Sequence, residues 1–416
     1  MKKIKVLFSK IVLLIATINL CLGGLSVFSR VHADSSAFNM DARAVYAIDA
    51  QSGQVLYQKN ATKQYPIASV IKILTLGVIE QDIRNHHLKW DQKIKITPAV
   101  AKMADDWHFS NVPLKNGEEY TVKQLVDSMM LVSADGSTEA LALADAGSTA
   151  AFNKKMQAFA KKAGVTDAKI YNMIGLPNGD LGKHKLKNVD KDAENLLSAK
   201  DVALISKYLV EKYPETLEIT KQKFANFDVT KDQQYLMTNV NALLPQNGFA
   251  PSTGEIDGLK TGNTDRAGKC IVSTGMFSGR RIILVALHTK GEWNDQSKMQ
   301  QDFYNKLTSE YRPVEIKNIS NISPKFKQVK VANAKDKNKA KLKLSRATAV
   351  WLPNNMKVET TKPSLKITKR YQKGNQLRAP LKKDQQVGSI ELHIPGLPNF
   401  NVPVSVNQTI AKKLIF

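Results

Sequence analysis

The sequence predicts a mixed α/β fold, followed by a small all-β domain at its C-terminal end. Within residues 34–312, strand-like segments lie near both ends and helix-like segments lie between them, an order typical of a sheet covered by helices. After Pro313 the sequence changes to short alternating segments interrupted by Pro, Gly and Asn, which favours a small β domain. A chain of 416 residues is long enough for more than one core.

Residues 1–33 have the pattern of a secretory signal peptide. Four lysines precede an apolar segment from Ile11 to about Val27, and Val31-His32-Ala33 supplies small residues for cleavage. The apolar segment is interrupted by Asn19 and two glycines, so it is short of a full membrane span. We therefore expect cleavage rather than a retained membrane anchor, and a secreted chain that begins near Asp34.

Two hairpins are predicted at the ends of the first domain, and we expect their strands to share one sheet. The first joins residues 45–49 and 54–57 through Ser52-Gly53, and the second joins residues 270–273 and 282–287 through Gly279-Arg280-Arg281. Between them, the segment from Ser69 to about Gln81 is apolar on most of a helix surface, which predicts a buried central helix. Further helical patterns lie at residues 125–131, 140–146 and 151–163.

The positive charge is concentrated after Pro313. The whole chain has 61 Lys and Arg against 37 Asp and Glu, whereas residues 313–416 have 21 against 5. Such a surface outside the cell attracts anionic wall polymers or a membrane surface, although it can also serve solubility alone. Export and the lack of a nucleic-acid-binding module exclude nucleic acid as the partner. The last residues, 410–416, are too few for firm membrane anchoring.

The sequence contains no pattern for a metal site or a disulfide. Removal of the signal peptide leaves Cys270 as the single cysteine, so no intramolecular disulfide can form. The histidines have no metal-ligand spacing. We expect no metal and no cofactor.

Ser69 and Lys72 form a candidate nucleophile and base. Three residues apart on a helix, their side chains share one face and can form a hydrogen bond. A serine hydroxyl needs a base to become a nucleophile, and a lysine withdrawn from water can have a pKa low enough to serve as one. The start of the helix also favours developing negative charge.

Two further motifs make the assignment of this pair as nucleophile and base more specific. Ser133-Ala134-Asp135 lies between helical segments, and Lys260-Thr261-Gly262 precedes the second hairpin. A Ser-x-x-Lys motif alone is common by chance. Together with a Ser-Asp-Asn-like motif and Lys-Thr-Gly in this order, it is typical of penicillin-binding proteins and class A β-lactamases.

With these motifs, the sequence resembles the low-molecular-mass penicillin-binding proteins, the serine-type D-Ala-D-Ala carboxypeptidases. The similarity covers roughly residues 40 to 400 and extends to residues 66–69, 112–118, 172–178 and 257–268. The resemblance implies a β-lactamase/penicillin-binding-protein-like transpeptidase domain at residues 34–312 and a basic β-rich domain at residues 313–416. It implies peptidoglycan stem peptides as substrate, removal of their terminal D-alanine, and inhibition by β-lactam antibiotics.

The resemblance also assigns the catalytic residues. Ser69 would attack the carbonyl of the D-Ala-D-Ala bond, Lys72 would take its proton, and Ser133 would relay a proton to the departing D-alanine. The backbone N–H groups of Ser69 and Asn263 would form the oxyanion hole.

The third motif would bind the substrate. Lys260 would keep the site electropositive, and Thr261 would bind the substrate carboxylate. Gly262 would let the substrate lie against the strand, because a side chain there would block it.

The sequence departs from the family at two places. Asp135 replaces the usual Asn, so this position can accept but not donate a hydrogen bond when ionised, and its charge works against Lys72 as a base. Residues 291–297 lack the Arg that often assists carboxylate binding in relatives, and Lys290 is an inferior candidate for its place.

Other functions stay open at this point. Asp135 and the missing Arg are compatible with a catalytically weak or inactive homologue that binds the wall. A β-lactamase would need a deacylating Glu, for which Glu194 and Glu211 lie in the right region. A related endopeptidase or transpeptidase is the fourth possibility, and the fold does not decide among them.

Overall fold

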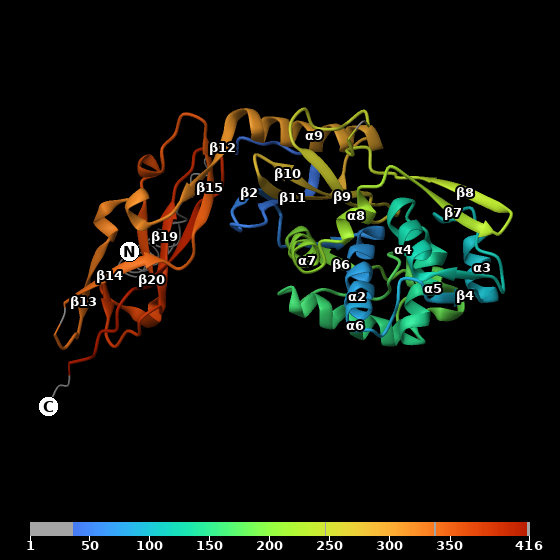
Figure 1. The fold of residues 1–416 in the computed structure, drawn as a ribbon, viewed down its shortest axis with the longest axis horizontal. Coiled ribbons are helices and arrows are strands. Elements are labelled where there is room, and N and C mark those ends of the chain that lie inside the picture. The colour runs from blue at the N-terminus through green and yellow to red at the C-terminus, as the bar shows by residue number, and fades with distance from the viewer. Residues whose placement is uncertain (1–35, 246, 337, 414–416) are drawn as a thin grey trace, which may run out of the picture. The chain divides into compact units, whose positions relative to one another are not determined.

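A five-stranded antiparallel sheet is the centre of the first region. The computed structural model describes residues 36–245, 247–336 and 338–413, so the predicted signal peptide lies outside the described residues. The strand order is β2-β1-β11-β10-β9 (Figure 1). The predicted sharing of one sheet by the first and last strands is confirmed. The bounds are β1 Ala42–Asp49, β2 Val55–Lys59, β9 Glu255–Gly262, β10 Lys269–Phe277 and β11 Arg280–Thr289.

The second hairpin differs from the prediction in its turn. Ser278–Gly279 joins β10 to β11, whereas Arg280 and Arg281 already belong to β11. Arg280 is bound by the carboxylate of Asp49 through two hydrogen bonds of 2.8 Å. Arg280, which was predicted to lie in the turn, is therefore a strand residue with an acidic partner.

Helix α2 is buried in the middle of the helices on one face of this sheet. It follows a single 3-10 turn, η1 (Ala68–Ile71), and it contacts α5, α6 and α7. Gly77 permits the close contact with α6, because a Cβ atom there would lie 2.4 Å from the ring of Phe159. The helices are α2 Lys72–Arg84, α3 Pro98–Ala104, α4 Val122–Leu131, α5 Asp135–Ala146, α6 Thr149–Lys162, α7 Ala199–Lys212, α8 Thr216–Thr220 and α9 Trp293–Glu310.

Side-chain caps fix where several of these helices begin. Thr121 and Gln124 form a reciprocal capping box at the start of α4, and Ser198 and Asp201 do the same for α7. Short strand pairs connect the helices. They are β3 Gln64–Pro66 with β6 Leu196–Ser198, β4 Lys93–Lys95 with β5 Glu119–Thr121, and the hairpin of β7 Phe224–Thr230 with β8 Gln233–Thr238.

The described residues after α9 form strands and short 3-10 turns, as the sequence predicts. Two of the short alternating segments, at residues 341–344 and 364–367, lie in β14 and β16. Within the described part of the chain, no helix combines the length and apolar character needed to cross a bilayer. The strands are β12 Tyr311–Ile316, β13 Gln328–Ala332, β14 Lys339–Leu344, β15 Thr348–Pro353, β16 Ser364–Ile367, β17 Gln372–Lys373, β18 Gln376–Arg378, β19 Gln386–Leu392 and β20 Phe400–Val406.

The buried apolar residues form two cores. One lies between the sheet and the helices around α2. The other includes the opposite face of the sheet, α9 and the C-terminal strands, so that Leu284 and Tyr304 share it with Trp351. Because this second core contains residues from both sides of residue 313, a domain boundary there stays a prediction.

Asp49 and Gln54 form polar links between the sheet and the C-terminal strands. The fully buried carboxylate of Asp49 binds Arg280, accepts a hydrogen bond from the backbone N–H of Ser52 at 2.8 Å, and accepts another from the indole N–H of Trp351 at 2.9 Å. The side chain of Gln54 also bonds the backbone of Trp351, accepting from its N–H at 2.6 Å. A charge removed from water in this way is stabilised by its partners.

We therefore expect Asp49→Ala to lower the free energy of unfolding by about 3–5 kcal/mol, because it leaves a guanidinium and an indole N–H without their acceptor. Urea titration monitored by tryptophan fluorescence measures this change. Asp302→Ala, which removes an exposed pair with Lys298, is the control and should cost no more than about 1 kcal/mol. Equal effects of the two substitutions would contradict the assignment.

Candidate active site

Ser69 lies in the 3-10 turn that precedes α2. Its hydroxyl accepts a hydrogen bond of 2.8 Å from the amine of Lys72, so the structure brings together the two groups singled out by their spacing. The turn begins with Ala68, whose φ of +49° is in the left-handed region. This local strain ends the incoming strand abruptly and presents Ser69 at the start of the helix.

The amine of Lys72 is completely buried and has four oxygen neighbours. Besides Ser69, it lies 2.6 Å from a carboxylate oxygen of Asp135, 3.0 Å from the backbone carbonyl of Ile174 and 3.4 Å from the hydroxyl of Ser133. Ser69, Lys72, Ser133 and Asp135 therefore form one hydrogen-bonded cluster.

Burial and charge act in opposite directions on this cluster. Burial lowers the pKa of Lys72, while the negative charge of Asp135 raises it. Burial likewise raises the pKa of Asp135, and the charge of Lys72 opposes that rise. The net shift makes the neutral amine, the form that can act as a base, easier to reach than in water.

Ser133 and Asp135 are positioned by the connection between α4 and α5. Ser133 has a φ of +63°, and Asp135 is the first residue of α5. The backbone N–H of Asp135 donates to the carbonyl of Ser110 at 2.8 Å, and that of Gly136 donates to the side chain of Asn111 at 2.8 Å. The segment at residues 110–111 thereby holds the start of α5 in place.

The loop at residues 172–175 supplies the carbonyl that the sequence did not reveal. The side-chain oxygen of Asn172 accepts hydrogen bonds from the N–H groups of Ile174 and Gly175 at 3.0 and 2.7 Å. This turn directs the carbonyl of Ile174 at Lys72. A backbone acceptor has no side-chain signature, so only its turn-forming Asn is visible in the sequence.

The third motif forms the end of β9, an edge strand of the sheet. Lys260 is buried, and its amine donates to the carbonyl of Thr261 at 2.9 Å. Burial, and then the charge of Lys72, hold the pKa of Lys260 well below its usual value. At Gly262 a Cβ atom would lie 2.8 Å from the backbone nitrogen of Ser69, so a glycine is needed for this close approach.

One cavity of about 500 Å³ joins these elements. Ser69 and Ser133 line it from the helical side, and Thr261 to Asn263 line it from the sheet edge. Lys72, Asp135 and Lys260 lie behind this surface. The sequence did not single out the remaining lining residues, which are His108, Ser110, Val132, Val240, Ala242, Ile271, Trp293, Asn294, Gln296 and Ser297.

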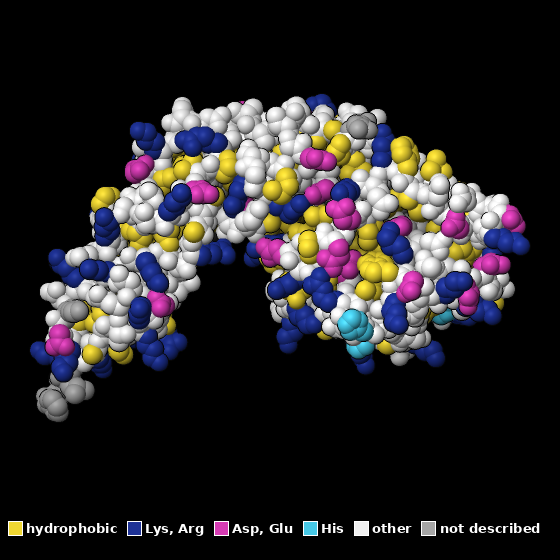
Figure 2. All heavy atoms as spheres, in the orientation of Figure 1, with side chains coloured by type: hydrophobic (Ala, Val, Ile, Leu, Met, Phe, Trp, Pro, Cys, Tyr) yellow, Lys and Arg dark blue, Asp and Glu magenta, His cyan; other side chains and the backbone are white. Residues whose placement is uncertain are grey.

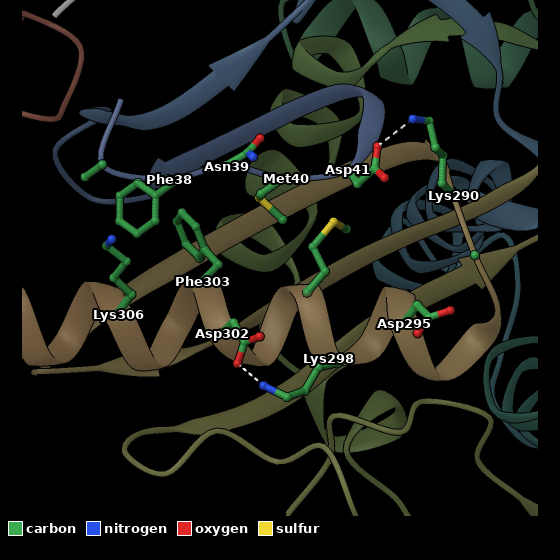
Figure 3. A pocket seen from close by; sticks show the side chains of 13 residues that line it. Phe38, Asn39, Met40, Asp41, Lys290, Asp295, Lys298, Asp302, Phe303 and Lys306 are labelled. Atoms are coloured by element: carbon green, nitrogen blue, oxygen red, sulfur yellow. Dashed lines mark hydrogen bonds and ion pairs between the residues drawn. The ribbon is translucent and has the colours of Figure 1, made fainter. Parts of the chain in front are cut away.

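Three sequence candidates lie away from this cavity. Lys290 pairs with Asp41 at 3.2 Å and borders a different cavity beside α9 (Figure 3), so the suggestion that it replaces a carboxylate-binding Arg is wrong. The carboxylate of Glu194 accepts a hydrogen bond from Thr264 at 2.7 Å, and Glu211 pairs with Lys207. Neither glutamate lines the cavity that contains Ser69.

Comparison with known proteins identifies the family. The family model described as D-alanyl-D-alanine carboxypeptidase matches residues 30–291. The chain belongs to the D-alanyl-D-alanine carboxypeptidase family. A curated relative, the D-alanyl-D-alanine carboxypeptidase DacC of Escherichia coli, is 30% identical over 388 residues, which cover 89% of this chain and 85% of the relative.

Solved structures of related proteins share the fold. A peptidoglycan synthesis regulatory factor from Streptococcus pneumoniae is 25% identical, with a TM-score of 0.65, over 90% of this chain and 100% of its own. A penicillin-binding protein from Listeria monocytogenes in its ampicillin-bound form is 26% identical, with a TM-score of 0.52, over 64% of this chain and 96% of its own. The mixed α/β fold and the β-rich C-terminal part are thus those of a carboxypeptidase of this family.

We expect Asp135→Asn to shift the pH dependence of Ser69 acylation. Loss of the negative charge that raises the pKa of Lys72 should lower that pKa further, so that more of the amine is neutral at low pH. The acid limb of the acylation rate, measured with fluorescent penicillin, should then move to lower pH.

Asp302→Asn, at an exposed pair on α9, is the matched control and should leave the profile unchanged. An acid limb that stays in place or moves to higher pH in Asp135→Asn would contradict the role of the Asp135 charge in raising the pKa of Lys72.

Proposed function

We propose that this chain is a serine-type D-Ala-D-Ala carboxypeptidase that removes the terminal D-alanine from peptidoglycan stem peptides. The observation that carries the proposal is the 2.8 Å hydrogen bond between Ser69 and the buried amine of Lys72, at a cavity bordered by a second hydroxyl and an exposed strand edge. Membership of the carboxypeptidase family gives the substrate class.

In the acylation step, the hydroxyl oxygen of Ser69 attacks the carbonyl carbon of the D-Ala-D-Ala bond and its proton passes to neutral Lys72. The tetrahedral oxyanion lies between the backbone N–H groups of Ser69 and Asn263. When the C–N bond breaks, Ser133 relays the proton from Lys72 to the amine of the departing D-alanine. Water then attacks the acyl carbon, the ester bond to the Ser69 oxygen breaks, and a proton of the water passes through Lys72 to that oxygen.

The strand edge binds the substrate. A Cβ atom at Gly262 would meet the backbone of Ser69, so the glycine keeps the end of β9 beside the nucleophile, where an extended peptide can lie alongside the strand. Thr261 provides a hydroxyl for the end of the peptide. Lys260, buried behind the cavity, favours the developing oxyanion in its protonated form.

The same chemistry accounts for inhibition by β-lactam antibiotics. A β-lactam carbonyl placed at Ser69 would be attacked in the same way, and the opened ring would stay attached as an acyl-enzyme. The ampicillin-bound relative from Listeria monocytogenes supports this proposal. The positions of Glu194 and Glu211 outside the cavity lining argue against the glutamate-assisted hydrolysis that a β-lactamase would need.

The full chain should release D-alanine from a pentapeptide ending in D-Ala-D-Ala, and Ser69→Ala should abolish both this release and labelling by fluorescent penicillin. Mass spectrometry of the labelled protein would locate the adduct. Ser36→Ala, outside the cavity lining, is a serine control and should behave as wild type.

Absence of both penicillin labelling and D-alanine release would favour the inactive wall-binding homologue, whereas labelling without release would favour the catalytically weak one. Persistent labelling of Ser69→Ala would contradict the nucleophile assignment.

We further propose that the chain is secreted and held at the wall or membrane surface by its basic C-terminal region. Lys and Arg side chains are numerous over the C-terminal strands in Figure 2. On β14, Lys339, Lys341 and Lys343 point to solvent while the alternate residues are buried. Lys330 of β13 lies directly opposite Lys339 of β14. This like-charge pair destabilises the sheet unless an anion lies nearby.

Reversing three of these charges tests the proposal without disrupting the second core, which deletion of residues 313–416 would expose. Lys330→Glu, Lys339→Glu and Lys341→Glu together should weaken binding to isolated cell walls by at least about tenfold, because each basic residue contributes about 1 kcal/mol near an anionic surface. Sedimentation with purified walls at physiological salt measures the binding.

The control carries Lys89→Glu, Lys93→Glu and Lys95→Glu, which reverse exposed lysines on or beside β4. If both triple variants lose binding equally, net charge rather than the C-terminal surface determines attachment. Unchanged binding of the first variant would also contradict the proposal.

A further inference from the structure

His108 is an ionisable side chain at the surface of the active-site cavity. Among the described residues that line this cavity, no other is a histidine, a lysine, an arginine or an acid. The lysines of the site lie behind the surface, where the amine of Lys260 donates to the carbonyl of Thr261. Of the described lining residues, His108 is therefore the one that can present a positive charge directly to a substrate.

The two preceding residues hold the imidazole ring of His108. Its Nδ1 forms a hydrogen bond of 2.8 Å with a carboxylate oxygen of Asp106, and the backbone N–H of His108 donates to the same oxygen at 3.0 Å. The indole of Trp107 stacks on the imidazole, with ring centroids 3.7 Å apart. A carboxylate on one ring nitrogen favours the protonated form of the ring and fixes the direction of the other nitrogen.

The other ring nitrogen of His108, Nε2, is available to a ligand. It has no hydrogen-bond partner among the described residues, and the side chain is 62% exposed. His108 borders both the active-site cavity and a second cavity of about 640 Å³ beside α3. The ring is thus held on one side and open on the other, at the entrance to the site.

The segment that carries His108 is tied to the catalytic cluster. Two residues further along, the carbonyl of Ser110 accepts a hydrogen bond of 2.8 Å from the backbone N–H of Asp135. In the proposed reaction, Ser133 gives a proton to the amine of the departing residue. Because one carbon atom separates that amine from the terminal carboxylate, the carboxylate also lies in the part of the cavity near Ser133. His108 and Ser133 line the same cavity.

A carboxylate at this place needs a cationic partner that the other candidates do not supply. Thr261 offers a hydroxyl, which is a neutral donor. Lys290 borders a different cavity. Burial, and then the charge of Lys72, hold the pKa of Lys260 well below its usual value, so this lysine is not a permanent cation. A protonated imidazole, in contrast, donates a charge-assisted hydrogen bond to a carboxylate.

We propose that protonated His108 binds the terminal carboxylate of the substrate, donating from Nε2 on the helical side of the cavity while Thr261 donates from the sheet edge. The inference rests on the proposed function and adds a specificity-determining residue to it. Because a histidine side chain changes its charge between pH 5 and 8, this recognition of the free carboxylate is strong at low pH and weakens as the pH rises.

Other charged groups lie around His108, on its own segment, on α3 and behind the active-site surface. They are Lys102, Asp105, Asp106, Lys72, Asp135 and Lys260. Burial lowers the pKa of the two lysines behind the surface, so they too lose charge as the pH rises. A pH dependence of substrate binding is therefore assigned to His108 by its loss when this residue is replaced.

The test uses the full chain carrying Ser69→Ala, so that a peptide can bind without being cleaved. The peptide is N-acetylated, ends in D-Ala-D-Ala and has its terminal carboxylate as its only charge, which fixes the group that is recognised. Its Kd is measured by NMR titration at pH 5.5 and at pH 8.5. The carboxylate is ionised at both values, so a difference in Kd reports charges of the protein.

Adding His108→Gln removes the charge and keeps a polar side chain of similar size. It should raise Kd at least about fivefold at pH 5.5, because a charge-assisted hydrogen bond is lost, and less than about twofold at pH 8.5. Circular dichroism establishes that the variant is folded. His393→Gln, which replaces a histidine beside Glu391 outside the cavity lining, is the control and should leave Kd within about twofold at both pH values.

Two results would overturn the inference while leaving the proposed function intact. They are an effect of His108→Gln on Kd that is equal at the two pH values, and no effect at either. The chain that retains Ser69 is assayed in parallel for release of D-alanine from the same peptide. Failure of this release would instead overturn the proposed carboxypeptidase function, and this inference with it.

Discussion

The buried amine of Lys72 is the group on which the arrangement of the active site depends. It joins the turn before α2, the connection between α4 and α5, and the loop that carries Ile174. A charged amine in a protein interior is tolerated only when its hydrogen bonds are satisfied. Because two of these three segments also carry Ser69, Ser133 and Asp135, stabilising the lysine and assembling the catalytic groups are one structural requirement.

This requirement explains why other helices surround α2. The helix is buried along its length, which withdraws the amine from water and lowers the pKa of Lys72. The sheet edge completes the site from the other side, where the lack of a side chain at Gly262 lets the strand reach the backbone of Ser69. Asp135 works against the base by favouring its charged form, so the site combines a well-placed nucleophile with a partly restrained base.

The sequence predicted the parts of the site that depend on local spacing. The distance along a helix is enough to relate Ser69 to Lys72. The glycine of the third motif was predicted to give the substrate clearance, whereas the clash that the structure shows for a Cβ atom there is with the backbone of Ser69. Apolar periodicity likewise predicted the buried helix, and strand-like segments joined by turn residues predicted the two hairpins of the sheet.

What the sequence could not predict depends on contacts between distant segments or on the backbone. The carbonyl of Ile174 has no side-chain signature. His108 belongs to none of the motifs, and its place at the cavity depends on contacts between its segment and the start of α5. Lys290 was wrongly considered for the site for the same reason, because its partner Asp41 lies just before β1 and is far from it in the sequence. The pairing of Arg280 with Asp49 also joins residues that are distant in the sequence.

The most direct test of this account compares acylation of Ser69 in Asp135→Asn with that in the double variant Lys72→Met/Asp135→Asn. The shared Asn avoids leaving a carboxylate buried without its cation, so both proteins should fold. Loss of the amine should slow labelling by fluorescent penicillin by at least about 100-fold, the usual contribution of a general base. Labelling rates within about threefold of each other would contradict the central claim that Lys72 activates Ser69.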